Sequence, residues 1–198
     1  YKAFDILIAS QSNDQNFIEN MINTKNRINE NIILYCFTVN KLKFLFYILN
    51  KLNVISDPIS LQSIYSQVND NGENILHMSI ITQSENILKF IFNLKPTKGI
   101  KMNHFTQKTF DKGYLPLHLM ILNYKNFSKT IISLEYVKKI TDNINIFEQD
   151  FFGNNVLHLS IAENNLDLFN LFLNKILSTE NIGDFFNFTN LEGFTPLH

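Results

Sequence analysis

The chain has 198 residues, of which 45% are hydrophobic and 18% charged, and its formal net charge is −1. This length suits one or two domains, and the near-neutral charge argues against a general nucleic-acid binder. The single cysteine, Cys36, excludes an intrachain disulfide, and the longest apolar run, Phe44 to Leu49, is far too short to span a bilayer.

Two helix pairs are predicted in the first third of the chain. Phe4–Ser10 and Phe17–Ile22 indicate a first pair of short helices. The apolar stretches Ile32–Tyr35 and Leu42–Lys51 indicate a second pair. Both pairs lack the motif that marks the rest of the chain.

From residue 72 onward, a motif of the form Gly-x-x-x-Leu-His occurs four times. The copies begin at Gly72, Gly113, Gly153 and Gly193 and end at His77, His118, His158 and His198. The glycines are 41, 40 and 40 residues apart. A motif that returns at a near-constant period predicts a repeat protein.

The third motif position predicts a helix start. In three copies it holds a good N-cap residue, namely Asn74, Asn155 and Thr195. Pro116 and Pro196 occupy the first helical position, where a proline costs no hydrogen bond. Leu115 cannot cap, so we expect that helix start either to be weaker or to be held by packing.

Each of the first three motifs is followed by a helix, a polar break and a second helix. The breaks are Thr82–Asn86, Asn123–Asn126 and Glu163–Asn165. The second helices are predicted from apolar residues at helical spacing: Ile87, Phe90, Ile91 and Leu94; Phe127, Ile131 and Leu134; Leu168, Leu171, Phe172 and Ile176.

This pattern resembles the ankyrin repeat, whose helix-opening signature is T-P-L-H-x-A. Thr195-Pro196-Leu197-His198 matches its first four letters, Leu115-Pro116-Leu117-His118 matches three, and the other two copies keep Leu-His. The resemblance implies one all-α domain over residues 1–198, a solenoid of stacked helix-turn-helix units with long insertions between repeats. The expected units are about 1–25 and 26–68, both degenerate, the repeats 69–110, 111–149 and 150–189, and the start of a truncated repeat at 190–198. In the 26–68 unit, Tyr35 is interpreted as standing where the histidine would be.

The period exceeds the family's usual one of about 33 residues. The extra residues are expected after the second helices, in Lys95–Phe110, Glu135–Gln149 and Leu177–Thr189. We expect lengthened second helices, above all at Glu135–Thr141, followed by hairpin-like segments. Because Tyr1 is not methionine and the last motif stops in its first turn, we expect a piece of a longer protein.

The resemblance implies a structural role for the motif histidines, each imidazole bonding to the turn and fixing the helix start. Successive stacked helices lie about 8–10 Å apart, too far for these side chains to share a metal. Neither a phosphate-binding glycine loop, a nucleophile elbow nor a Cys-x-x-Cys pair occurs in the sequence. We therefore predict no catalytic, cofactor or metal residues in this segment, and a buried structural role for Cys36.

Two features are candidate contact sites. Residues 89–112 contain one acidic residue, Asp111, and six lysines, so their local net charge is 6 − 1 = +5. The lysines are Lys89, Lys95, Lys98, Lys101, Lys108 and Lys112. They form either a solvated insertion or a patch for an acidic or phosphorylated ligand. Phe151 and Phe152 precede Gly153, and they are either an exposed contact pair or buried under the preceding insertion.

The predicted function is protein–protein recognition by a scaffold or adaptor. One alternative is a regulatory segment of a larger enzyme of acyltransferase, phosphodiesterase or kinase type, docking on its own catalytic domain; another is sensing of an anionic small molecule. The expected partner is another protein or a domain of the same chain, with no nucleic acid, membrane span or cofactor. The expected location is intracellular, cytoplasmic or nuclear.

Overall fold

The computed structural model describes residues 20, 23–55, 64–93, 103–127, 134–142, 144–178 and 187–198. Within these ranges the regular elements are all helices, so the all-α prediction is confirmed. The chain divides into two compact units, Tyr1–His104 and Phe105–His198. The helix pair predicted over Phe4–Ser10 and Phe17–Ile22 lies outside the described residues.

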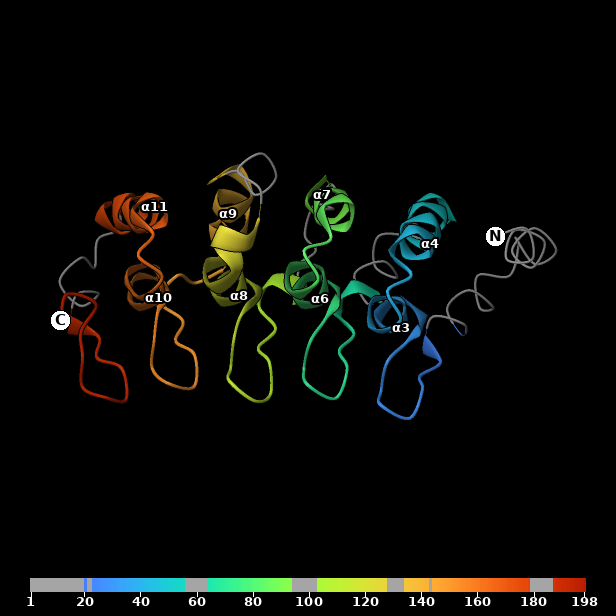
Figure 1. Ribbon diagram of the computed structural model, residues 1–198, viewed down its shortest axis with the longest axis horizontal. Helices are drawn as coiled ribbons and strands as arrows, with labels where there is room; N and C mark the ends of the chain where they lie inside the picture. Colours follow the sequence, from blue (N-terminus) through green and yellow to red (C-terminus); the bar gives the residue numbers. More distant parts are fainter. Residues whose placement is uncertain are drawn as a thin grey trace. The chain divides into compact units, whose positions relative to one another are not determined.

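The described part of the first unit contains two antiparallel helix pairs. They are α3 (Ile32–Thr38) with α4 (Leu42–Ile55), and α6 (Ile75–Ile81) with α7 (Glu85–Asn93). Helix α3 packs on α6 and α4 packs on α7, so first helices and second helices form separate layers (Figure 1).

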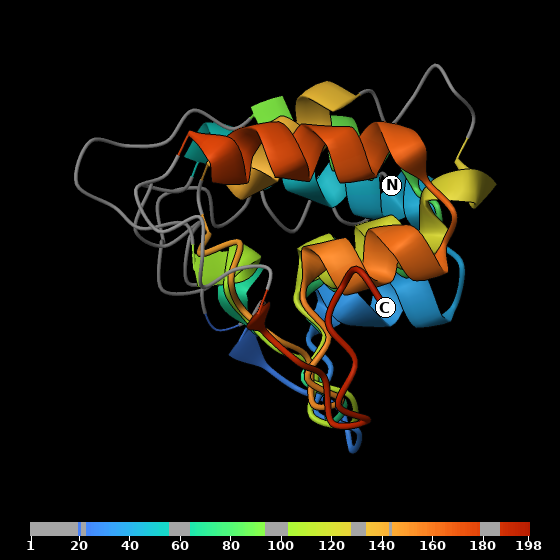
Figure 2. The ribbon, with the colours of Figure 1, turned by 90° about the vertical axis from the view of Figure 1, so that its left-hand side faces the viewer.

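The second unit repeats this arrangement. It contains α8 (Pro116–Asn123), the 3-10 turn η2 (Tyr124–Asn126), α9 (Leu134–Thr141), α10 (Val156–Ala162) and α11 (Leu166–Leu177). Helix α8 packs on α9 and α10, and α10 packs on α11. In Figure 2 the α10–α11 pair is nearest the viewer, with its hairpin projecting from the α10 side. The segment Glu135–Thr141, predicted as a lengthening of the second helix, lies in α9, which begins at Leu134. Phe127, predicted on the same helix, has an extended backbone and lies outside it, and residues 128–133 are outside the described residues.

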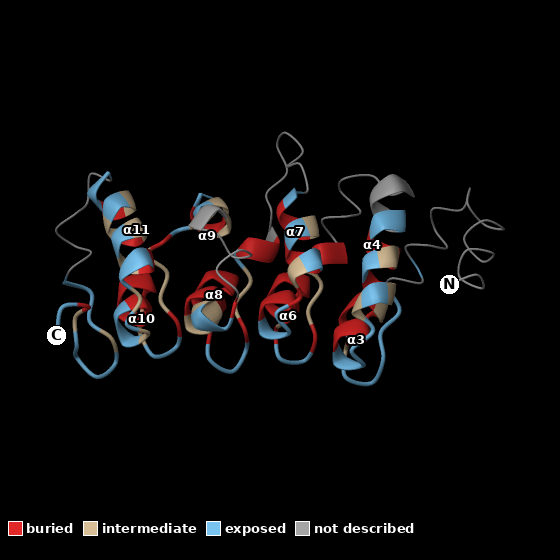
Figure 3. Cartoon of the chain, turned by 45° about the horizontal axis from the view of Figure 1, so that its top comes forward, coloured by how far each residue is buried: buried red, intermediate tan, exposed pale blue. Residues whose placement is uncertain are grey.

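A further 3-10 turn, η1 (Asn103–Phe105), precedes the hairpin that leads into α8. The first helices are short and largely buried, whereas the hairpin tips are exposed (Figure 3). In α6, for example, every residue from 75 to 80 is buried. The helices therefore supply the core, and the hairpins supply surface.

Three of the first helices end at a residue in the left-handed conformation. These residues are Asn40, Gln83 and Asn164, with φ of 53°, 52° and 49°. Each is followed by an amide that reaches back to the last turn, as where Asn165 N donates to Ser160 O at 2.9 Å. This Schellman-type ending turns the chain sharply into the second helix. After α8 the 3-10 turn η2 takes its place, within the polar break that the sequence predicts.

The register of the first described repeat differs from the one predicted. Asn31 caps α3 by accepting a hydrogen bond from Leu34 N at 2.9 Å. Leu34, which is 1% exposed, therefore occupies the histidine position, and the interpretation of Tyr35 was wrong because the cap, not the apolar run, sets the register. Asn29, with φ of 60°, stands where later hairpins have glycine.

Helix α11 shows how the second helices are held. Leu168, Phe172 and Ile176 recur at a spacing of four residues and are each 0% exposed. The predicted apolar stripe of this helix thus faces the core, while Leu171 is half-buried.

Replacing Phe172 with alanine should lower the free energy of unfolding by about 3–5 kcal/mol, because it removes a fully buried ring and leaves a cavity. Leu166→Ala is the matched control, since Leu166 is 69% exposed on the same helix. Its effect should stay within about 0.5 kcal/mol. Urea denaturation measures both values, and equal losses would contradict this account of the core.

Candidate functional site

The junction between each hairpin and its first helix is closed by hydrogen bonds. Asn74 Oδ1 accepts from Leu76 N at 3.0 Å and from His77 N at 3.1 Å, while Asn74 N donates to His77 Nδ1 at 3.3 Å. Asn155 and His158 make the same three bonds at the start of α10. Amides that a helix start leaves unpaired are thus satisfied by side chains.

The histidine of the third motif, His158, also joins two repeats. Its Nδ1 accepts a hydrogen bond from Asn155 N, which leaves Nε2 as the ring nitrogen that faces the next hairpin. His158 Nε2 lies 3.0 Å from Phe194 O, to which it donates. One imidazole therefore connects a helix start to the next hairpin.

The start of α8 is built differently. Leu115 has no side-chain acceptor, and only its amide bond to His118 Nδ1, at 3.3 Å, remains. Leu115 is 2% exposed and Pro116 is also buried. The start of α8 therefore lacks a side-chain cap, and its first residues are packed in the core instead.

Replacing Asn155 with alanine should lower the free energy of unfolding by about 0.5–2 kcal/mol, because two amides of α10 lose their acceptor. Asn164→Gly is a control on the same repeat that relieves a left-handed backbone and should not be destabilising. Urea denaturation of the two variants measures the difference. A cap variant as stable as the wild type would contradict the role given to Asn155.

The motif histidine of α8 is deeply buried. Burial lowers the pKa of His118 from 6.5 to about 4, although Asp150 opposes this shift. Burial likewise lowers the pKa of His104 to about 4. Both imidazoles are therefore neutral in the folded chain at neutral pH.

The free energy of unfolding should fall as the pH drops from 6.5 toward 4. In this range the two histidines bind protons in the unfolded chain but remain neutral in the folded chain. Each ring should contribute a slope of about 1.4 kcal/mol per pH unit in this window. His118→Gln should reduce that slope, whereas His198→Gln, at an exposed position, should keep it. Urea unfolding at pH 7 and pH 5 tests this, and equal slopes in the two variants would count against it.

The hairpins themselves are organised by a polar residue that the sequence analysis missed. Asp150 Oδ1 accepts from Phe152 N at 2.9 Å and from Asn154 N at 2.8 Å. The equivalent residues, here called turn caps, are Asn26, Asn69, Thr109, Asp150 and Asn190. The available signal was the Asn or Asp three residues before Gly72, Gly153 and Gly193.

Thr109 explains the one irregular step in the period. It caps its hairpin through Oγ1, which accepts from Tyr114 N at 3.0 Å. Gly113 is four positions after Thr109, whereas Gly72 is three positions after Asn69. The hairpin with the threonine cap is one residue longer, which gives the 41-residue step between these glycines.

Neighbouring hairpins of the second unit are joined through their main chains. Phe151 N donates to Lys112 O and Leu191 N donates to Phe152 O, both at 2.9 Å. The glycines allow this close approach. A Cβ atom on Gly113 would overlap the Phe151 ring, and one on Gly153 would lie 2.9 Å from Asn190 Cα.

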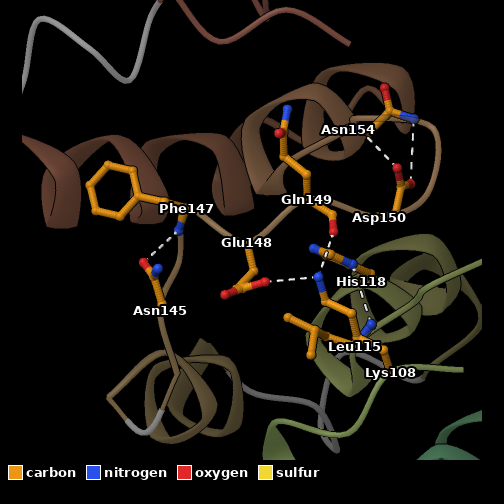
Figure 4. A network of polar contacts seen from close by, with 9 residues as sticks. All are labelled: Lys108, Leu115, His118, Asn145, Phe147, Glu148, Gln149, Asp150 and Asn154. Carbon is orange, nitrogen blue, oxygen red and sulfur yellow. Dashed lines mark hydrogen bonds and ion pairs between the residues drawn. The ribbon is translucent and has the colours of Figure 1, made fainter. Parts of the chain in front are cut away.

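Side chains add a second set of bonds between the same hairpins. Lys108 Nζ donates to Gln149 O at 2.9 Å and lies 2.8 Å from Glu148 Oε2 (Figure 4). One repeat later, Gln149 Nε2 donates to Thr189 O at 3.3 Å. The residues before two turn caps, Lys108 and Gln149, thus reach the next hairpin.

These bonds hold a row of exposed apolar side chains. The residue after the turn cap is Phe110, Phe151 or Leu191 in the second unit, with exposed fractions of 58%, 53% and 79%. We call these three residues the hairpin row. In the first unit the equivalent residues are the charged Arg27 and Asp70.

The sequence analysis left the environment of Phe151 and Phe152 open. Phe151 is 53% exposed and Phe152 is 48% exposed, so each ring presents about half of its surface. Phe151 covers Gly113 with the rest. The pair is therefore available for contact while anchored to the neighbouring hairpin.

The six lysines of the predicted basic patch fall into three groups. Lys95, Lys98 and Lys101 lie outside the described residues, and Lys89 is exposed on α7 of the first unit. Lys108 is engaged with Glu148 and Gln149, and exposed Lys112 lies 5.8 Å from the centre of the Tyr114 ring. The patch remains a prediction.

The described residues offer little for catalysis or metal binding. Burial raises the pKa of the Cys36 thiol to about 11, so it is protonated at neutral pH. Across the described ranges, His, Cys, Asp and Glu side chains do not gather in groups able to hold a metal ion. In the same part of the chain, the helices fall short of the length and apolar character that a membrane crossing requires.

The chain has helix pairs in two layers, joined by glycine hairpins, and its motif places an Asn, Thr or Pro near a histidine. These features define the ankyrin-repeat fold, and the predicted resemblance is confirmed. No family model matches the sequence. The chain is 28% identical over 129 residues to the nuclear factor NF-kappa-B p105 subunit of Gallus gallus. The aligned residues make up 65% of this chain and 12% of that relative. The alignment thus spans only about an eighth of the relative's length.

A solved structure shares the fold. The crystal structure of the ankyrin repeat domain of Bcl-3, described as a unique member of the IkappaB protein family, superposes with a TM-score of 0.51. The match covers 89% of this chain and 80% of the Bcl-3 chain at 14% sequence identity. At that identity the likeness concerns the fold.

Proposed function

We propose that this chain is a protein-recognition module that binds its partner through the hairpin row. The observation that carries the proposal is the recurrence of an exposed apolar residue at one structural position in three successive hairpins, Phe110, Phe151 and Leu191. Single exposed apolar residues are common on protein surfaces, but a repeated row of them marks an interaction surface.

The support beneath the row favours binding. Main-chain bonds from Phe151 N and Leu191 N tie these two hairpins each to the one before it. Side chains held in place before binding lose less conformational freedom on association. Aromatic residues such as Phe110 and Phe151 are also frequent interface anchors.

The part of the partner that meets the row is proposed to be apolar, because the three side chains of the row are apolar. Exposed charges flank the row at Asp111, Lys112 and Glu192, whereas Lys108 is bound to Glu148. The partner can be a separate protein or another domain of the same polypeptide. A regulatory segment docking on its own catalytic domain would use the same surface.

Replacing Phe110 and Leu191 together with serine should weaken partner binding by about 30-fold or more, the effect of losing an interface hot spot. These residues are chosen because they are more exposed than Phe151, so the fold should tolerate the change. Proteins captured from a lysate by the wild-type chain should be lost from the variant.

The matched control is Leu166→Ser with Leu177→Ser, which removes two leucines that are 69% and 52% exposed on α11. This control should capture the same proteins as the wild type. If the hairpin variant captures them equally well while the control does not, the hairpin row is not the binding surface.

A further inference from the structure

The two second helices of the first unit, α4 and α7, each carry a stripe of exposed residues. The stripe is Lys43, Phe46 and Asn50 on α4, and Asn86, Lys89 and Asn93 on α7. Steps of three and four residues place the members of a stripe on the same side of their helix. Because α4 packs on α7, the two stripes belong to neighbouring helices, whose exposed parts are pale blue in Figure 3.

An aromatic ring on this surface stands at a position that is polar in other repeats. Leu34 and His77 are equivalent and lie 43 positions apart, and the same step leads from Phe46 to Lys89. In α11 of the second unit, the equivalent residue is the exposed Asn170. Phe46 is nevertheless 38% exposed, so an apolar side chain occupies an outer position that two other second helices fill with polar ones.

Phe46 is held in place by an aromatic residue of the next helix. Its ring packs edge-to-face on the half-buried Phe90, with 6.0 Å between the ring centroids and 79° between the ring planes. Lys43 lies one turn before Phe46, and Lys89 directly precedes Phe90, so a lysine accompanies the ring pair on each helix. We call Lys43, Phe46, Lys89 and Phe90 the second-helix patch.

The surroundings of the second-helix patch are basic. Residues 41–55 and 85–93 contain four lysines and one carboxylate, Glu85, so their local net charge is 4 − 1 = +3. The lysines are Lys41, Lys43, Lys51 and Lys89. Ion pairs within the described part of the chain involve Lys108, Lys125 and Lys175, none of which lies on α4 or α7.

The second helices of the second unit have less excess charge. Residues 134–141 and 166–177 contain three lysines against Glu135 and Asp167, a net charge of 3 − 2 = +1. One of these lysines, Lys175, is bonded to Asp142. The basic charge and the exposed ring together therefore distinguish the second helices of the first unit.

We propose that the second-helix patch binds an acidic peptide segment of a partner protein. An aliphatic side chain of the segment lies on Phe46, and carboxylates on either side of it meet Lys43 and Lys89. Charge complementarity selects this occupant, because lysines beside an apolar contact match carboxylates beside an aliphatic residue. An aromatic centre with a charged rim is also the usual anatomy of a protein interface.

An anionic membrane fits the same charges less well. Membrane-surface helices insert large apolar side chains between the lipids. Phe46 lies against Phe90 and is only 38% exposed, which leaves little side chain to insert. The patch is a different surface from the hairpin row, and the proposal does not depend on the function proposed above.

A fluorescein-labelled peptide of sequence Ser-Glu-Asp-Leu-Glu-Asp-Ser is the probe, and fluorescence anisotropy with the 198-residue chain measures its binding. We expect a dissociation constant below about 1 mM at low salt, rising as salt screens the charges. The same peptide with glutamine and asparagine in place of its acidic residues should bind at least about tenfold more weakly.

The variant Lys43→Glu with Lys89→Glu reverses both charges of the patch and should weaken binding of the acidic peptide by about tenfold or more. Its matched control is Lys25→Glu with Lys138→Glu, which changes the net charge equally at exposed positions outside the patch. The control should change the affinity by less than about twofold, because distant surface charges are screened.

Phe46→Ser tests the apolar part of the patch. The wild-type chain should prefer the peptide with leucine at its centre over one with serine there, since the leucine buries apolar surface on Phe46. Phe46→Ser should abolish this preference while keeping the salt dependence of binding. An unchanged preference would place the leucine elsewhere and contradict the proposal.

Two further results would overturn the proposal. One is a dissociation constant above about 1 mM for the acidic peptide, and the other is an equal loss of affinity in the Lys43→Glu, Lys89→Glu variant and its control. Vesicles of phosphatidylcholine and phosphatidylserine test the membrane alternative, and the chain should not sediment with them. Sedimentation that the same charge reversal abolishes, without peptide binding, would assign the patch to a membrane instead.

Discussion

Each repeat depends on the junction where its hairpin enters the first helix. A helix start leaves several amides without partners, and a short helix of seven or eight residues has few other bonds to offset them. The Asn74 and Asn155 side chains satisfy two amides each, and the neighbouring histidine satisfies a third. The junction also fixes the direction in which the hairpin leaves the helix layer, so the positions of the exposed side chains follow from it.

The lateral bonds of the second unit convert separate hairpins into one continuous surface. Glycine is required at Gly113 and Gly153 because the next hairpin occupies the space of a side chain. Its left-handed backbone, with φ of 67° and 78°, is a second reason for glycine there. The same residue thus shapes the turn and admits the neighbour, which explains why the motif begins with it. Asn29, which stands where later hairpins have glycine, adopts the same left-handed backbone with φ of 60°, a conformation that asparagine tolerates.

Several elements could be predicted because their signals are local. The caps Asn74 and Asn155, the proline at 116 and the stripe Leu168–Phe172–Ile176 lie within a few residues of the structure that they specify. The register around Tyr35 was misread because the cap residue Asn31 was overlooked in favour of the apolar run. The turn caps were missed for a related reason: Thr109 replaces Asn or Asp and lengthens its hairpin, which hides the pattern.

The amino-acid sequence by itself determined the repeat, its period and the ankyrin-type helix pair, because caps, turns and apolar spacing act between residues close along the chain. Only the tertiary structure decided which apolar residues remain at the surface. Phe151 and Phe172 are both phenylalanines, yet one lies on a hairpin and is 53% exposed while the other is 0% exposed. The exposed fraction of each side chain depends on how the repeats stack. Stacking brings together residues about 40 positions apart, as where Phe151 contacts Lys112 and Gly113.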